Sequence, residues 1–276
     1  YTNAKAFFSR EDYNKLYPVF EDSMQPIVAK GTPFPEATVF PVVPLNADSL
    51  YFTWKDTAAI VATKPDKDNG SNNWVVGGTK TKSGRPILCN DPHLGLNLPS
   101  LWYEMQITTA SYSTYGVSFP GAPSIIIGFN DSISWGVTNA ARDVRDYYQI
   151  KFKDDTRSQY WFNNQWKKAE QRVETYVMKD KSFFSDTVAY TVFGPVMYDK
   201  TFSGRGRAVH ADLAVKWRAH DASNELQTFN ALNKAKNYND YVEAISTFSC
   251  PGQNFAFASK EGDIAIWQQG LFPAKW

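Results

Sequence analysis

The sequence predicts an α+β fold in which antiparallel β-structure predominates and helices flank it. From residue 71 onward, short apolar runs alternate with turn residues at close spacing, which is typical of antiparallel strands. Two amphipathic helical patterns follow late in the chain. A final pair of strands is then joined by Lys260-Glu261-Gly262, a hairpin-turn signature.

Residues 1–70 have a different character and are expected to form a separate region from residues 71–276. They begin with a mixed helical pattern and continue through a proline-rich extended stretch over 26–44. The segment Asp66-Lys67-Asp68-Asn69-Gly70 then predicts an exposed loop, where proteolytic or autolytic opening is mechanically easiest.

The β-region is expected to contain many short strands. They are predicted at 74–78, 86–90, 102–109, 125–129, 133–137, 147–152, 172–178, 187–193, 254–259 and 263–268. Leu226, Phe229 and Leu232 predict one helix after Ser223. Tyr241, Ile245 and Phe248 predict a second, with Asn239 as its N-cap.

Composition and charge exclude several classes of partner. The 29 basic and 28 acidic residues leave a net charge of +1, which gives no reason to expect nucleic acid or an anionic membrane as partner. Two cysteines, Cys89 and Cys250, are too few for a zinc site, so each is interpreted as a small buried hydrophobe. A disulfide between them is the alternative in an exported protein. The chain begins at Tyr1 without a targeting segment, which suggests a removed leader or an excised piece.

The dipeptide Gly70-Ser71 is the candidate centre of the chemistry. A serine hydroxyl needs a base within hydrogen-bond reach, and an N-terminal serine carries one in its own α-amine, with a pKa of about 7.7 to 8.0. Ser71 would gain that amine if the bond after Gly70 were cut. The same hydroxyl can attack the preceding carbonyl, and Gly70 suits this because it permits a strained backbone. The simpler interpretation is a Gly-Ser turn before a strand.

Four ordered motifs carry a resemblance to a known family. They are Ser71-Asn72-Asn73-Trp74-Val75-Val76-Gly77-Gly78, then Asn90-Asp91-Pro92-His93-Leu94-Gly95, then Gly128-Phe129-Asn130-Asp131-Ser132-Ile133-Ser134-Trp135-Gly136-Val137-Thr138-Asn139, and Gly252-Gln253-Asn254-Phe255-Ala256-Phe257-Ala258. Together they resemble the start of the β-subunit of the penicillin acylase family of N-terminal-nucleophile amidohydrolases. The resemblance implies a four-layer αββα sandwich. Residues 1–70 resemble the end of the α-subunit and the linker peptide.

The resemblance also assigns catalytic roles. It makes Ser71 the nucleophile and Gly70–Ser71 the cleavage site, with His93 bonding the serine region and orienting its amine. The backbone N–H of Asn139 and the side-chain amide of Asn254 would bind the tetrahedral oxyanion, a contribution of about 3 kcal/mol per donor. Each has a simpler interpretation, because His93 can be a turn residue, Asn139 can end a strand and Asn254 can cap a turn.

Other residues are assigned by the same resemblance. Leu94, Ile127 and Val137 fall where relatives line the acyl pocket, although aliphatic residues are also typical of a core. Lys275 replaces a common arginine and loses the bidentate fork.

The resemblance also implies a structural calcium ion, bound by Asp143, Asp146 and the backbone carbonyl of Arg145, and no cofactor for catalysis. Ser259 stands where the family often has aspartate, and the competing interpretation is that the acids are solvated or paired with an arginine such as Arg142.

The expected activity is hydrolysis of a linear amide in an N-acylated small molecule, in a periplasmic or secreted bacterial protein. The expected partners are the substrate and the remaining α- and β-subunit segments of the same precursor, with no nucleic acid or membrane. The rival interpretations are an acyl-homoserine-lactone or peptide acylase, a non-catalytic aromatic-rich binding module, and an unprocessed, inactive fragment.

Overall fold

The computed structural model of the chain describes residues 7–16, 31–33, 70–95, 97–199 and 212–274. The chain divides into two compact units, Tyr1–Val43 with Ala274–Trp276, and Pro44–Pro273. The proline-rich stretch over 34–44 and the loop over 66–69 lie outside the described residues, as does most of the stretch before them. In the described part of the chain, no helix has the length and apolar character needed to cross a membrane.

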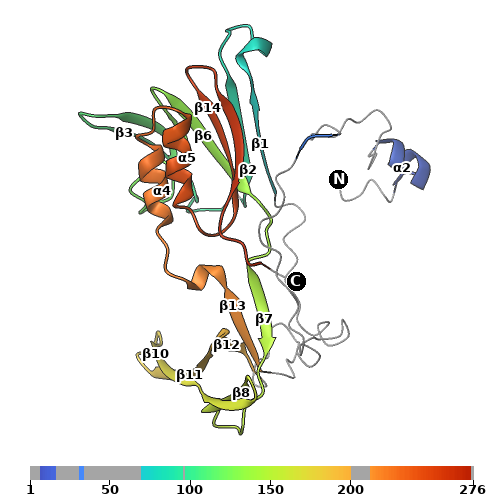
Figure 1. Cartoon of the computed structure of the whole chain (residues 1–276), viewed down its shortest axis with the longest axis vertical. Helices are drawn as coiled ribbons and strands as arrows, with labels where there is room; N and C mark the ends of the chain where they lie inside the picture. Colours follow the sequence, from blue (N-terminus) through green and yellow to red (C-terminus); the bar gives the residue numbers. More distant parts are fainter. Residues whose placement is uncertain (1–6, 17–30, 34–69, 96, 200–211, 275–276) are drawn as a thin grey trace. The chain divides into compact units, whose positions relative to one another are not determined.

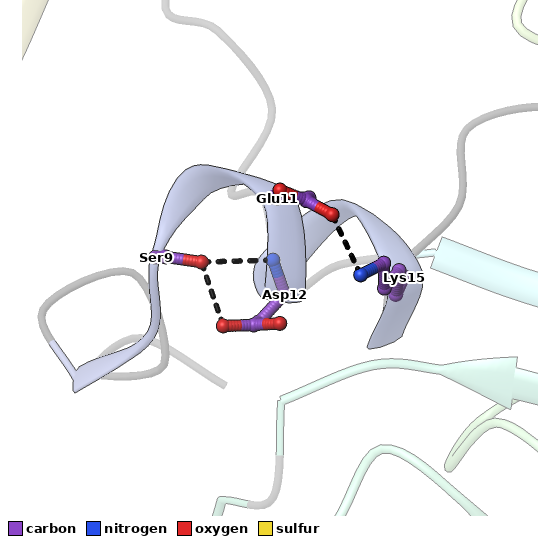
Figure 2. A network of polar contacts seen from close by, with 4 residues as sticks. All are labelled: Ser9, Glu11, Asp12 and Lys15. Carbon is purple, nitrogen blue, oxygen red and sulfur yellow. Dashed lines mark hydrogen bonds and ion pairs between the residues drawn. The ribbon is translucent and has the colours of Figure 1, made fainter.

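The described part of the first unit contains one short helix, α2 (Arg10–Leu16), inside the stretch for which a helical pattern was predicted. Ser9 begins it, because its Oγ accepts a hydrogen bond from the Asp12 N–H at 3.1 Å and donates to the Asp12 carboxylate at 2.7 Å. Lys15 donates to Glu11 one turn away at 2.7 Å (Figure 2). These local contacts stabilise the helix, since none of its residues is buried.

The second unit is mostly antiparallel β-structure, as the sequence predicts, with two α-helices in its described part (Figure 1). A six-stranded sheet has the order β15-β14-β6-β5-β4-β3. Its strands are β3 (Tyr103–Thr108), β4 (Ser113–Ser118), β5 (Ile127–Asn130), β6 (Ile133–Asn139), β14 (Gln253–Ser259) and β15 (Ile264–Gln269). The predicted hairpin between the last two is confirmed, with Gly262 at a φ of +110° in its turn.

Two further sheets and a separate ribbon complete the β-structure. A five-stranded sheet of order β10-β11-β12-β13-β7 contains β7 (Arg145–Gln149), β10 (Glu170–Val177), β11 (Phe183–Thr191), β12 (Gly194–Tyr198) and β13 (Leu213–Trp217). A hairpin pairs β8 (Gln159–Phe162) with β9 (Gln165–Lys168). The ribbon, named here the Ser71 ribbon, pairs β1 (Gly70–Val76) with β2 (Ile87–His93). It forms no backbone ladder with the six-stranded sheet.

The two helices cover one face of the six-stranded sheet and bury its core. They are α4 (Glu225–Leu232) and α5 (Tyr238–Ser246) (Figure 1). Phe255 and Phe257 of β14 are fully buried against them, and the buried Tyr241 hydroxyl donates to the Phe255 carbonyl at 2.9 Å. Asn233, after α4, is also buried. Its Oδ1 accepts from the Ile125 N–H at 2.9 Å, and its Nδ2 donates to the Ile125 carbonyl at 2.8 Å.

The N-cap of α5 differs from the sequence prediction. Asn237, not Asn239, caps the helix, because its side chain accepts a hydrogen bond from the Asp240 N–H at 3.0 Å. The helix therefore includes Tyr238, whose ring packs against Tyr241 and Phe257. Packing of this aromatic residue against the sheet sets the helix start two residues earlier than its apolar periodicity indicates.

The Ser71 ribbon packs on the face of the sheet opposite the helices (Figure 1). The contact is close at Gly136 of β6, where an added Cβ would lie 2.5 Å from Asn90 Oδ1 of β2. The order of layers is thus helices, six-stranded sheet, ribbon. This arrangement places β1 against β6 and β14, which carry two of the predicted site residues.

Both cysteines are free. Cys250 is buried and Cys89 is half-buried, so each contributes to packing and neither forms a disulfide in this structure.

Candidate active site

Ser71 is the second residue of β1, and the structure extends this strand back to Gly70, four residues before the predicted start. The side chain is half-buried. Its Oγ donates a hydrogen bond of 2.5 Å to the carbonyl oxygen of Gly70, the residue before it. The hydroxyl therefore lies against the peptide group that the sequence analysis identified as the cleavage site.

The ribbon has an inner face that carries Ser71. Asn73, two residues further along β1, donates from Nδ2 to the backbone carbonyl of Asn254 at 3.1 Å, so it faces the six-stranded sheet. Side chains two apart in a strand share a face. Ser71 consequently points to the same side as Asn73, toward the sheet that carries Asn254.

Asn254 and Asn139 lie side by side on neighbouring strands. Asn254 of β14 is paired with Thr138 of β6, and Asn139 follows directly. The Asn254 amide donates to the Thr138 hydroxyl at 3.2 Å and to the Asn139 carbonyl at 3.3 Å, while its Oδ1 accepts from Gln268 at 3.3 Å. These bonds fix the orientation of the Asn254 side chain.

The backbone N–H of Asn139 is directed away from β14. The next residue, Ala140, donates to the Gly252 carbonyl across the ladder at 3.0 Å, and successive N–H groups of a strand point to opposite edges. On the other edge, the pairing of β6 with β5 ends at Trp135 in the described part of the chain. The Asn139 N–H therefore lies beyond the ladder on that edge, where a backbone donor can serve an added acceptor.

His93 lies on the outer face of the ribbon, opposite to Ser71. It is paired with Gly70, and directly paired residues of an antiparallel ladder share a face. Its Nε2 is 2.9 Å from the Asp91 carboxylate and 3.5 Å from the Asn72 amide. The structure does not bring the imidazole toward the Ser71 hydroxyl, and its role in orienting the amine stays a prediction.

Three of the four residues predicted to bind substrate lie in the described part of the chain. Ile127 and Val137 are partly buried and pack against the core beneath the helices. Leu94 is exposed after the end of β2. Lys275 lies outside the described residues. A role in substrate binding stays a prediction for all four.

The predicted calcium ligands lie at the start of β7, which begins at Arg145. Asp143 accepts from the Arg145 N–H at 3.4 Å, and Asp146 is paired with Lys216 in the ladder of β7 and β13. The described residues contain no group of three or more His, Cys, Asp or Glu placed to hold a metal. The hydroxyl of Ser259 accepts from the Asp263 N–H at 3.1 Å within its own turn. Calcium binding by Asp143, Arg145 and Asp146 stays a prediction.

Sequence reasoning did not single out Asn73 or Asn90. These two residues are directly paired across the ribbon and both face the sheet. Asn90 has both amide atoms buried and without a hydrogen-bond partner among the described residues, which is uncommon for a native side chain. The sequence could have indicated them because both are polar residues within apolar strands. Which face of the ribbon they occupy depends on strand pairing, which the sequence does not show.

Comparison with known proteins identifies the family of the chain. The structure of the thermostable penicillin G acylase from Alcaligenes faecalis matches with a TM-score of 0.61 and 28% identity, over 72% of this chain and 35% of that one. The family model described as penicillin amidase matches residues 2–276. The chain therefore belongs to the penicillin amidase family.

Curated relatives include acyl-homoserine lactone acylases and penicillin acylases. The chain is 28% identical over 212 residues to acyl-homoserine lactone acylase QuiP of Pseudomonas aeruginosa, which covers 74% of this chain and 25% of the relative. It is 26% identical over 207 residues to penicillin G acylase of Escherichia coli, over 74% of this chain and 23% of the relative. The chain thus spans about a quarter of the length of these relatives.

Proposed function

We propose that this chain carries the nucleophile and oxyanion donors of an amidohydrolase that cleaves the linear amide of an N-acylated small molecule. The observation that carries the proposal is the inner face of the Ser71 ribbon. Ser71 shares this face with Asn73, which is hydrogen-bonded to Asn254, beside Asn139. A nucleophile facing two amide donors is the arrangement that acyl transfer requires.

The chemistry begins with cleavage of the chain itself. The Ser71 Oγ, already against the Gly70 carbonyl at 2.5 Å, attacks the carbonyl carbon of that residue and forms an ester as the peptide bond breaks. Water then hydrolyses the ester, leaving a carboxylate on Gly70 and a free α-amine on Ser71. The close contact between hydroxyl and carbonyl supports this step.

The freed amine then acts as the base for substrate hydrolysis. It accepts the proton of the Ser71 hydroxyl as Oγ bonds to the amide carbon, and the oxyanion accepts hydrogen bonds from the Asn139 N–H and the Asn254 amide. Asn254 exchanges one of its present bonds, to Thr138 or Asn139, for this contact. The proton passes to the leaving amine, and water resolves the acyl-enzyme by the same path.

The proposal also includes the complete fold, the cellular location and a calcium ion. Further segments of the same protein would complete a four-layer αββα sandwich, whose described part here contains one helical and two β-layers. The proposed location is periplasmic or secreted. A calcium ion would be structural and would take no part in these steps.

A second candidate substrate is an acyl-homoserine lactone. It is favoured by the names of several relatives, which are acyl-homoserine lactone acylases. A panel of chromogenic acyl amides and acyl-homoserine lactones, offered to the complete protein, separates the two substrate classes by which amide is hydrolysed faster.

Intact mass spectrometry tests the central claim. The complete protein should yield fragments divided before Ser71, and the Ser71→Ala variant should remain uncut and inactive. A serine-directed inhibitor should label the unmodified protein at Ser71. An uncut, unlabelled and inactive protein would instead support a non-catalytic binding module.

A further inference from the structure

We propose that Asn73 is a positioning residue that holds the strand of Ser71 in register with the strand of Asn254. The inference rests on the proposed function and adds a residue to its site. Asn73 touches neither reacting atom in this structure. It acts through the spacing between the nucleophile and the oxyanion donor.

The Ser71 ribbon is attached to the six-stranded sheet by side chains. Among the described residues β1 pairs only with β2, so no backbone ladder joins the Ser71 ribbon to the six-stranded sheet. A ladder fixes register between strands, whereas packing of two sheet faces does so weakly. Side chains must therefore set the position of Ser71 along β14.

A hydrogen bond from Asn73 joins the ribbon to β14. Asn73 Nδ2 donates to the Asn254 carbonyl at 3.1 Å, across 181 positions of sequence. Among the described residues, no other hydrogen bond joins the ribbon to the six-stranded sheet. Its acceptor is the backbone of the same residue whose side-chain amide is the proposed oxyanion donor.

Asn73 lies close to the proposed nucleophile. Ser71 is two residues from Asn73 on the same strand, a separation of about 7 Å. Such a short, hydrogen-bonded stretch transmits a shift at Asn73 directly to the Ser71 hydroxyl. A displacement of about 1 Å at a reacting group costs up to about 100-fold in rate.

The neighbouring contact explains why packing alone is insufficient. Asn90, the ladder partner of Asn73, lies against Gly136 of β6, where the glycine leaves room for it. This van der Waals contact limits how closely the ribbon approaches the sheet. A directional hydrogen bond is needed to limit sliding, and Asn73 supplies it.

The experiment compares matched amide-to-acid substitutions in the complete protein. Asn73→Asp keeps the side-chain shape but removes the N–H donor, while Gln106→Glu makes the same change at an exposed amide on β3 that donates to Ser113. Asn73→Gln restores a donor. The measurements are kcat and KM for the amide substrate that the unmodified protein cleaves fastest, acylation by phenylmethylsulfonyl fluoride, and the thermal unfolding midpoint.

For Asn73→Asp, we expect kcat and the acylation rate to fall about 10- to 100-fold while KM changes less than about threefold. Asn73→Gln should recover part of the loss, and Gln106→Glu should show none. If Asn73→Asp does not accumulate as folded protein, Asn73→Ala removes the donor without adding charge and is measured instead.

Two results would overturn the proposal. One is a kcat for the donor-less variant within about twofold of the unmodified protein. The other is a loss that disappears when each protein is assayed at the same interval below its own unfolding midpoint, because this indicates a purely structural role. An unmodified protein that neither cleaves amides nor reacts with the inhibitor refutes the proposed function as well, so the two failures are distinguishable.

Discussion

Gly136 faces the side chain of Asn90 so closely that a Cβ on this glycine would lie 2.5 Å from Asn90 Oδ1 and 2.7 Å from Asn90 Cβ. Real Cβ atoms essentially never approach another atom so closely, so any larger residue at 136 must push the Ser71 ribbon away from β6. The absence of a side chain at this position thus determines how near the nucleophile strand lies to the sheet.

Gly136→Ala is expected to destabilise the protein by about 1 to 3 kcal/mol, the usual effect of overpacking, and to lower amide hydrolysis. The measurement is urea-induced unfolding together with kcat/KM. Gly77→Ala is the matched control, because an added Cβ there lies 3.6 Å from Ile264 and the backbone has an ordinary φ of −67°. Equal stability of the two variants would contradict the packing argument.

The rate of amide hydrolysis is expected to rise with pH through the titration of the Ser71 α-amine. A protonated amine cannot accept the hydroxyl proton, so activity should be low below the pKa of about 7.7 to 8.0 and level off above it. A profile of kcat/KM between pH 5 and 9 provides the measurement. A flat profile, in protein shown to remain folded over this range, would rule out the amine as base.

Glu225 is expected to make stability depend on acidic pH. Burial of its carboxyl opposes ionisation, but hydrogen bonds from the Ser223 hydroxyl at 2.8 Å and from the N–H groups of Ser249 and Cys250 outweigh it, so the pKa of Glu225 is lowered from 4.5. A lowered pKa in the folded state contributes stability above the unfolded pKa, and this is lost as pH falls through the folded value.

Glu225→Gln should therefore lose about 1 kcal/mol at neutral pH, a value kept small because the group is partly exposed. The difference from the unmodified protein should shrink as pH falls below about 4.5, the unfolded value. Urea unfolding at several pH values measures both effects, with the exposed Glu243→Gln as control. A difference that stays constant down to pH 2 would show that the carboxylate charge has no role.

The N-cap of α5 offers a direct test of the corrected helix start. Asn237→Ala removes the acceptor of the Asp240 N–H and should cost about 1 kcal/mol, whereas Asn239→Ala, exposed within the first turn, should cost less than about 0.5 kcal/mol. Thermal or urea unfolding compares the two variants. The reverse order would restore Asn239 as the cap.

Much of the fold was predictable because local patterns decide it. The alternation of apolar runs and turns located most strands, and Lys260-Glu261-Gly262 located the last hairpin. Strand β4 (Ser113–Ser118) was not predicted, because its Ser-Thr-Tyr-Gly-Val-Ser sequence lacks an apolar run. Pairing with β3 and β5 on both edges makes it a strand.

The candidate site was also predictable only in part from the sequence. The sequence by itself determined which residues have suitable chemistry, a serine after glycine and two asparagines in ordered motifs, since side-chain chemistry and spacing are local properties. Only the tertiary structure decided that Ser71 and Asn73 face the sheet that carries Asn254, while His93 faces outward. A strand presents alternate residues to opposite faces, so the pairing register and the surface that covers each face determine which polar side chains meet.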